Sequence, residues 1–402
     1  MLVSSLGLTE GDVMTLNSDF DLQDQDVSAF RIRLRTWIGE NIAHLTPASS
    51  TEDSRRETNQ QMYDAGLLGL TWPKELGGRG LSSAHQTVWN DEMRDYQWSL
   101  PYSAVTVGIC APTVRDFGTP EQQTRHIPRM LRGDERWTQL LSEPGAGSDL
   151  ASVSTTATLD GDAYVITGQK VWTSLAVESD LALALVRTSR EERRHNGLSM
   201  VVVDLKAPGV EIRPLREITG ETNFNEVFLD GVRVSPDSIL GEVGGGWAVL
   251  IAMLTHERLA LGAGTTGSRM DADVFDSLVK LSQERGIIDE PHVSGALLDL
   301  YIEQRILDLN GIRIRRAIET SNPKGPLGSF VKVGTGSAAE AAARVSALVA
   351  GKATMAWSAE DAAAQEAAHL MLSFPMASIA GGTTEIQKNA IAERLLGLPR
   401  GS

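Results

Sequence analysis

Two short segments combine residue types suited to holding a planar cofactor: Ser142–Asp149, with the sequence SEPGAGSD, and Gly168–Ser174, with the sequence GQKVWTS. A glycine-rich turn lets backbone N–H groups approach a ligand, because no side chain stands in the way. Trp172 adds a flat apolar face that suits a tricyclic ring. Hydroxyls that can donate to ring or phosphate acceptors come from Ser142, Ser148 and Ser174. Together these features predict a bound flavin; for each serine by itself, turn capping is the alternative.

The elements that must hold these segments read as strands. Leu181–Val186 and Ser199–Asp204 are short apolar runs, and Glu226–Leu229 is another that closes on the turn dipeptide Asp230-Gly231. We therefore expect a β-rich middle domain over residues 137–240.

The flanking regions read as helices. Ala29–Ile38 carries apolar residues mostly at helical spacing, which predicts an N-terminal helical domain over residues 20–136. The triple glycine Gly244–Gly246 predicts a domain junction rather than a phosphate loop, because no Gly-Lys-Ser/Thr follows it. Ala338–Ala368 is alanine-rich and favours closely packed helices in a C-terminal domain over residues 241–402.

Composition narrows the class of protein. The 402 residues have room for two or three domains, and 42% hydrophobic with 22% charged content is ordinary for a globular protein. A net charge of −15 argues against nucleic-acid binding, because phosphates would be repelled. No run approaches the roughly 18 apolar residues of a membrane span. Met1–Asp19 lacks the basic start of a signal peptide, and we expect a flexible lead-in there.

The single cysteine limits the redox and metal chemistry. Cys110 lies in the apolar run Val107–Ala111, which predicts a buried, inert thiol rather than a nucleophile. One cysteine allows neither an intramolecular disulfide nor a cysteine-based metal site, and we expect no metal. This usage suits a reducing cytosol, so the expected location is cytoplasmic.

The two segments and three further motifs resemble the acyl-CoA dehydrogenase family. Leu67–Gly78 is similar to the family's N-terminal signature, and Gly118–Gln122 to its turn before the middle domain. Gly381–Gln387 and Glu393–Arg400 are similar to its C-terminal signature. The resemblance implies an α+β protein with an N-terminal helical domain, a middle β-barrel and a C-terminal four-helix bundle. It also implies FAD as cofactor and an acyl-CoA as substrate, dehydrogenated between its α and β carbons.

The resemblance assigns roles within the two cofactor segments. Ser142 occupies the position that hydrogen-bonds the flavin ring, Ser174 the position whose hydroxyl reaches flavin N5, and Trp172 packs against the ring. Residues that lie where the cofactor passes include Leu141, Gly147 and Ser148. Ser148 also lies beside the path of the CoA arm and is a candidate substrate contact.

The catalytic base departs from the commonest family pattern. Many members carry a glutamate just before the C-terminal Gly-Thr, where this chain has Gly381, which has no side chain. Other branches place the glutamate on an earlier helix beside an arginine, and Glu257 followed by Arg258 matches that arrangement. Leu254 and Leu261 lie three residues before and four residues after Glu257, so all three should share one helix face. We therefore expect the Glu257 carboxyl to be buried and its pKa to be raised. The alternative is a solvent-facing or Arg258-paired glutamate.

The C-terminal signature supplies further expected contacts. The backbone N–H of Gly381 is expected to bind the thioester carbonyl, because an N–H survives the change to glycine. Arg258 is expected to contact the substrate. Thr383 and Glu385 match positions that contact the FAD pyrophosphate and adenosine.

Two motifs that complete the flavin site across a subunit interface in the family are missing. The Arg-x-x-Phe-Gly region reads Ser268–Asp276 without Phe-Gly, and the Gln-x-x-Gly-Gly region reads Gln365–Met371 without paired glycines. We therefore expect a tetramer that includes a second, homologous subunit. A homo-oligomer that binds FAD through other residues is the alternative. The branch of the family that this chain resembles includes heteromeric dehydrogenases of steroid side chains and ring fragments.

Three functions compete. The first is an acyl-CoA dehydrogenase that passes electrons to an electron-transfer flavoprotein. The second is an oxidase or monooxygenase on the same fold, which would need oxygen access. The third is a non-catalytic structural subunit, against which the intact Ser142–Asp149 block and Glu257 argue. The choice between steroid-derived, branched, dicarboxylic and straight-chain substrates stays open.

Overall fold

The computed structural model describes residues 27–100, 104–262, 274–319, 326–356 and 361–399. The chain divides into two compact units, residues 1–103 with 119–136, and residues 104–118 with 137–402. The expected lead-in Met1–Asp19 and most of Ser268–Asp276 lie outside the described residues. Each unit is considered by itself.

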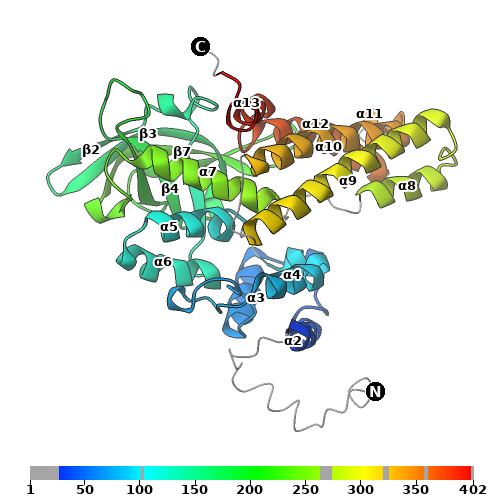
Figure 1. Cartoon of the computed structure of the whole chain (residues 1–402), viewed down its shortest axis with the longest axis horizontal. Helices are drawn as coiled ribbons and strands as arrows, with labels where there is room; N and C mark the ends of the chain where they lie inside the picture. The colour runs from blue at the N-terminus through cyan, green and yellow to red at the C-terminus, as the bar shows by residue number, and fades with distance from the viewer. Residues whose placement is uncertain (1–26, 101–103, 263–273, 320–325, 357–360, 400–402) are drawn as a thin grey trace, which may run out of the picture. The chain divides into compact units, whose positions relative to one another are not determined.

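The first unit is helical (Figure 1). Its helices are α2 Val27–Asn41, α3 Glu52–Asp64, α4 Ser83–Glu92 and α6 Pro120–Arg132, with short 3₁₀ helices at Pro47–Ser49, Lys74–Leu76 and Arg94–Ser99. The helix predicted from Ala29–Ile38 is confirmed as α2, because Phe30, Leu34 and Ile38 recur every four residues and are buried. Helix α6 begins with a reciprocal cap in which Gln122 N donates to Thr119 Oγ1 at 3.2 Å and Thr119 N donates to Gln122 Oε1 at 2.9 Å.

The second unit begins with one π-helical turn, η4 (Thr106–Cys110), that continues into α5 (Ala111–Phe117). An eight-stranded sheet follows, and β6, β7, β3, β2, β4, β5 and β8 pair in that order, with β1 parallel to β4. The strands are β1 Trp137–Leu140, β2 Thr156–Asp160, β3 Ala163–Ser174, β4 Leu181–Arg187, β5 Leu198–Asp204, β6 Val210–Leu215, β7 Phe224–Val234 and β8 Ile239–Leu240. The three predicted strands are confirmed as parts of β4, β5 and β7.

The expectation that a strand closes on Asp230-Gly231 is wrong. Strand β7 continues through both residues to Val234. The pairing with β3 shifts register here, since Ile166 lies opposite Val232 whereas Gly168 lies opposite Leu229. Gly231 has a φ of +65°, so the dipeptide forms a β-bulge that bends the strand instead of ending it.

The C-terminal part of the second unit is helical. Its helices are α7 Gly246–Gly262, α8 Val274–Glu284, α9 Pro291–Glu319, α10 Leu327–Ala350, α11 Ala353–Ala356, α12 Ala362–Ile379 and α13 Thr384–Arg394. Figure 1 shows α9, α10 and α12 running side by side, and α10 also packs on α7 and α13. Small buried residues such as Ala338, Ala342 and Ala343 let α10 approach its neighbours closely. The alanine-rich stretch is therefore helical, interrupted after Ala350 by Gly351 with a φ of +64°.

The helix that carries Glu257 is placed by a close backbone contact at its first residue. A Cβ atom added to Gly246 would lie 2.5 Å from the carbonyl carbon of Ser199 on β5 and 2.8 Å from Leu198 O. Backbone atoms inside a sheet cannot yield cheaply to such an overlap. Gly246 therefore sets how closely α7 begins against the sheet.

We predict that Gly246→Ala lowers the free energy of unfolding by about 1–3 kcal/mol, because the added methyl overlaps the β5 backbone. Urea denaturation followed by circular dichroism measures the change. Gly295→Ala is the matched control, since a Cβ atom at this position of α9 would meet no atom within 4 Å. Equal stability of the two variants would contradict the proposed role of the contact.

Candidate active site

A bulge in strand β3 presents Trp172 to solvent. The pairing of β3 with β7 shifts between Lys170 and Thr173, which leaves Trp172 with a φ of +60°. A left-handed conformation costs a residue other than glycine about 1–3 kcal/mol, and such strain gathers at functional sites. The indole is 61% exposed and meets Phe224 edge to face, with the ring centroids 6.0 Å apart. The ring is therefore exposed, as contact with a flavin would require, and that contact stays a prediction.

The Ser142–Asp149 segment forms a tight turn beside this bulge. Glu143 and Ala146 exchange backbone hydrogen bonds of 3.0 Å in both directions, and Val171 N donates to Ser142 O at 2.9 Å. A Cβ atom at Gly145 or Gly147 would meet nothing within 4 Å. The glycines therefore leave open space beside the turn, and Ser148 is exposed there. This is the open backbone surface that a phosphate-bearing cofactor requires.

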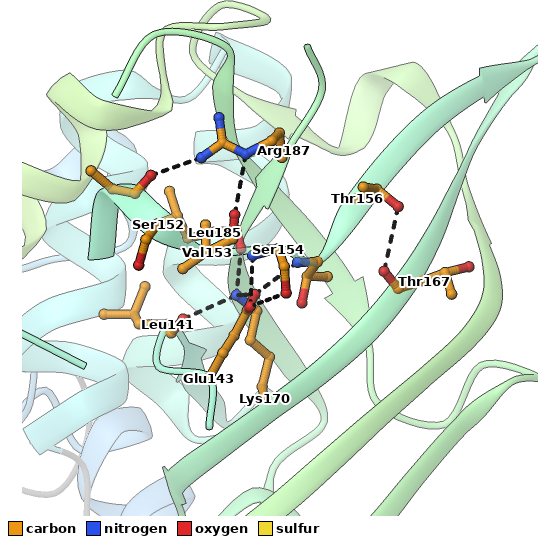
Figure 2. A network of polar contacts seen from close by, with 12 residues as sticks. Leu141, Glu143, Ser152, Val153, Ser154, Thr156, Thr167, Lys170, Leu185 and Arg187 are labelled. Atoms are coloured by element: carbon orange, nitrogen blue, oxygen red, sulfur yellow. Dashed lines mark hydrogen bonds and ion pairs between the residues drawn. The ribbon is translucent and has the colours of Figure 1, made fainter. Parts of the chain in front are cut away.

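A buried ion pair joins the two segments (Figure 2). Lys170 Nζ lies 2.9 Å from Glu143 Oε1 and also donates to Leu141 O at 3.0 Å and to Leu185 O at 2.7 Å. The Lys170 side chain has no exposed surface, and that of Glu143 is 5% exposed. The ammonium thus satisfies all three of its donors inside the protein.

The Glu143 carboxylate is equally well satisfied. It accepts from Ser154 N at 2.6 Å, from Ser154 Oγ at 2.7 Å and from Thr155 N at 2.9 Å. Burial by itself would raise the pKa of Glu143, but the Lys170 charge and these donors outweigh it and lower the pKa to about 2. Burial lowers the pKa of Lys170 to about 8 against the opposing charge of Glu143. Both groups are therefore charged at neutral pH.

Neither residue of this pair was expected to carry a role. A glutamate and a lysine that lie 27 positions apart give no local signal of contact. Lys170 lies in β3, where both it and Val171 are buried. A buried lysine requires a partner of opposite charge, so a lysine inside a strand is the signal that could have identified the pair.

The second group of expected residues surrounds Glu257 on α7. Glu257 is partly accessible as a residue, and burial of its carboxyl raises the pKa above its usual range. The charges of Arg258 and Lys332 and the Gln139 amide lower that pKa more weakly. His256 points elsewhere, since its Nε2 lies 2.8 Å from Asp116 Oδ2 of α5. A desolvated carboxyl with a raised pKa suits a general base.

Cys110 and Lys332 also face this carboxyl. The expectation of a buried thiol is confirmed, because Cys110 has no exposed surface and burial, with the Glu257 charge, raises its pKa. Lys332 on α10 is 5% exposed, and burial lowers its pKa while Glu257 opposes the change. Lys332 Nζ donates to Ala377 O near the end of α12, which ties the α7 carboxyl region to the helix that precedes Gly381.

The C-terminal signature has a structural organisation of its own. Gly381 has a φ of +69°, and its carbonyl accepts from Gln387 Nε2 at 3.0 Å. Gln387 in turn accepts from Ser329 Oγ of α10 at 2.7 Å. Thr383 caps α13 by accepting from Ile386 N at 3.3 Å, whereas Glu385 is exposed in the first helical turn. Gln387, which was not singled out in the sequence, therefore orients the backbone at Gly381.

Strand β1 connects the two groups of site residues. Gln139, which faces Glu257, precedes Ser142 by three residues on one continuous segment. Thr138 Oγ1 donates to Ser174 O at 2.8 Å. Strand β1 therefore links Ser142 and Ser174 to the Glu257 region. Arg258 Nε donates to Leu254 O at 2.7 Å within α7. The catalytic and binding roles expected of these residues stay predictions.

The sequence matches family models along most of its length. The acyl-CoA dehydrogenase N-terminal, middle and C-terminal domain models match residues 24–134, 138–232 and 244–396. Acyl-CoA dehydrogenase IpdE1 of Mycobacterium tuberculosis is 39% identical over 393 residues, which cover 94% of this chain and 99% of the relative. Acyl-CoA dehydrogenase FadE26 of the same organism is 35% identical and covers 86% of this chain and 88% of the relative.

Solved structures agree. The steroid ACAD Tcur3481-Tcur3483 superposes with a TM-score of 0.78 at 29% identity and covers 95% of this chain and 100% of that chain. The ChsE4-ChsE5 complex from Mycobacterium tuberculosis gives a TM-score of 0.77 at 30% identity and covers 94% of this chain and 98% of that chain.

The chain belongs to the acyl-CoA dehydrogenase family. It is therefore an FAD-dependent oxidoreductase of the acyl-CoA dehydrogenase class, and the expected arrangement of a helical N-terminal domain, a middle sheet domain and a helical C-terminal domain is confirmed. Among the helices of the described ranges, none has both the length and the apolar character needed to cross a membrane.

We predict that Lys170→Met destabilises the protein by about 3–5 kcal/mol, because Glu143 would be left buried without its counter-ion. Lys206→Met is the matched control, since Lys206 lies 2.8 Å from Asp180 but is 74% exposed, and it should cost about 0–1 kcal/mol. Chemical denaturation at pH 7 measures both variants. Similar losses in the two would show that burial of the Glu143–Lys170 pair has no special weight.

The same pair has a signature in acid. Because the pKa of Glu143 is depressed to about 2, its stabilising contribution is complete above about pH 4.5 and is lost as the pH falls toward 2. Lys170→Met raises that pKa toward or above the value of the unfolded chain, so the loss of stability between about pH 4.5 and pH 2 should be smaller in the variant than in the parent protein.

Proposed function

We propose that Glu257 is the general base that removes the α proton of an acyl-CoA thioester. The observation that carries this proposal is the desolvated carboxyl of Glu257, held between α7, α10 and β1 with a raised pKa. A base of raised pKa is strong enough to take a carbon-bound proton once it is ionised. Gly381 cannot act in this role, and no other carboxyl was assigned to it from the sequence.

Bound FAD supplies the acceptor for the hydride from the β carbon. The residues that would hold it are Trp172, with its exposed face, and the open turn of Ser142 to Ser148. Ser174, whose carbonyl is already engaged by Thr138, would direct its hydroxyl to the ring. The strained, exposed indole and the empty space beside Gly145 and Gly147 fit a large planar group with phosphates. Leu141, Thr383 and Glu385 remain proposed cofactor contacts.

The substrate carbonyl would be held by backbone rather than by a charged side chain. We assign the backbone N–H of Gly381 as the hydrogen-bond donor to this oxygen. Gln387 Nε2 donates to the Gly381 carbonyl and so holds the backbone of this residue in place. Arg258 and Ser148 are proposed to contact the substrate. The structural neighbour Tcur3481-Tcur3483, a steroid ACAD found both as itself and as a single-substitution variant, favours a bulky, ring-bearing acyl group as substrate.

An assembly with a second, homologous subunit is proposed as well. An apolar stripe on α9 is exposed at helical spacing, with Leu298 at 58%, Ile302 at 46%, Ile306 at 47% and Leu309 at 48%. Such a stripe needs cover, and a neighbouring subunit would provide it. The missing family motifs favour a different chain over a second copy, and one structural neighbour is itself a complex, ChsE4-ChsE5. An electron-transfer flavoprotein is the proposed electron acceptor, and a cytoplasmic location stays a prediction.

We predict that Glu257→Gln slows reduction of the bound cofactor by acyl-CoA about 10²- to 10⁴-fold, because proton abstraction is lost while the fold is kept. Anaerobic bleaching of the flavin absorbance with a panel of acyl-CoA thioesters measures the rate. In the parent protein the rate should rise with pH, since only the ionised carboxylate acts. Glu284→Gln, at an exposed residue of α8, is the matched control and should retain the parent rate.

Unimpaired bleaching in Glu257→Gln would refute the assignment of the base. Peroxide production on adding air to the reduced parent protein would favour the oxidase reading. Absence of bleaching with every thioester, in protein that holds its flavin, would favour a structural subunit.

We predict that Ile302→Glu combined with Ile306→Glu reduces the native mass, because two carboxylates would be buried in the proposed interface. Light scattering, with the FAD-to-chain ratio measured on the same sample, gives the assembly. Lys280→Glu, at an exposed position of α8, adds a carboxylate outside the stripe and should leave the mass unchanged. One FAD per chain in a homotetramer of the parent protein expressed alone would argue against a second kind of subunit.

A further inference from the structure

Strand β1 carries a buried amide that no role assigned above uses. Side chains alternate along a strand, and Leu140 points into the core of the sheet, so Gln139 points to the opposite side. Strand β1 also packs on η4, where Thr106 Oγ1 donates to Trp137 O at 3.1 Å and Cys110 Sγ donates to Thr138 O at 3.8 Å. Gln139 Nε2 is buried there, and no group of the described residues completes a hydrogen bond with it.

The group that this amide faces is the Glu257 carboxyl. The amide lies close enough to lower the pKa of Glu257, which a donor does by favouring the charged form. The other titratable groups around the carboxyl are Cys110 from η4, Lys332 from α10 and Arg258 from α7 itself. The adjacent His256 of α7 faces α5, where its Nε2 lies 2.8 Å from Asp116 Oδ2.

The thiol and the two cationic side chains near Glu257 donate hydrogen bonds to backbone carbonyls and not to its carboxyl. Cys110 donates to Thr138 O, Lys332 Nζ to Ala377 O and Arg258 Nε to Leu254 O. Gln139 differs, because its buried Nε2 has an unfilled capacity to donate. A buried donor without a partner is costly, so a position that retains one beside a carboxylate calls for an explanation.

We propose that Gln139 is a positioning residue for Glu257: once Glu257 is ionised, the unpartnered Nε2 closes to hydrogen-bond distance of one carboxylate oxygen and leaves the other oxygen free to take the substrate proton. This inference rests on the proposed role of Glu257 as the base. An amide suits the task because it is a donor at every pH and carries no net charge. A further cation would stabilise the carboxylate more strongly and weaken it as a base.

The decisive variant is Gln139→Met, which keeps the length of the side chain and removes the donor. The readout is exchange of the α hydrogens of a 3-thiaacyl-CoA in D₂O by the FAD-loaded protein, followed by mass spectrometry across pH. Sulfur replaces the β carbon in this probe, so no hydride can leave and only the proton transfer is observed. We expect the pH midpoint to move upward, with exchange about five- to tenfold slower below the midpoint and similar well above it.

The chain offers a chemically matched control. Gln169 on β3 also donates from Nε2 to a glutamate, Glu226 Oε1, at 2.9 Å, but away from Glu257. Gln169→Met should leave the pH midpoint where it is in the parent protein.

A second readout needs neither substrate nor activity. Because the pKa of Glu257 is raised, its ionisation costs stability as the pH rises through that value. Gln139→Met should enlarge this pH-dependent loss in the thermal midpoint. The enlargement should vanish when Gln139→Met is combined with Glu257→Gln, because no carboxylate is then left to hold.

Slower exchange by the same factor at every pH, or a pH-dependent loss that persists in the double variant, would overturn the proposal. Parent-like exchange in Glu257→Gln alone would instead refute the assignment of the base. If Gln139→Met does not fold, Gln139→Glu keeps the volume and places a second carboxyl beside Glu257. It should move the midpoint further upward, and an unmoved midpoint would likewise overturn the inference.

Discussion

The buried pair of Glu143 and Lys170 is the constraint on which the cofactor side of the site depends. It joins the Ser142 turn to strand β3 just before the bulge that carries Trp172. A charge without exposed surface cannot leave its partner cheaply, so the two segments hold each other in one register. The strained backbone of Trp172 persists because this pair and the β3–β7 pairing hold both ends of the bulge.

The catalytic side of the site depends on a balance of opposing electrostatic effects. Burial raises the pKa of Glu257, and Arg258, Lys332 and Gln139 lower it. Burial favours the protonated carboxyl, whereas close pairing with a cation favours the carboxylate and makes it a weaker base. Lys332 also donates to Ala377 O. Helix α10, whose Lys332 lowers the pKa of Glu257, therefore also holds the segment that leads to Gly381.

Glycines make this proximity possible. A Cβ atom at Gly108 of η4 would lie 3.2 Å from Ala260 Cβ, and one at Gly328 of α10 would lie 2.7 Å from Arg258 Cβ. Together with Gly246, these positions let a π-helical turn, a long helix and the sheet approach α7 from separate directions. The carboxyl of Glu257 is desolvated because three elements can pack this closely around one helix.

The sequence by itself determined the family, the order of the domains and the strands and helices with strong local patterns, because periodicity and turn chemistry act over a few residues. It also singled out Glu257 and Trp172, whose motifs are local. Only the tertiary structure decided that Asp230-Gly231 is a bulge, that Lys170 pairs with Glu143, and that Gln139 and Lys332 face Glu257. Those outcomes depend on burial and on contacts between residues far apart in the chain, and no local pattern encodes which distant group will fill a given space.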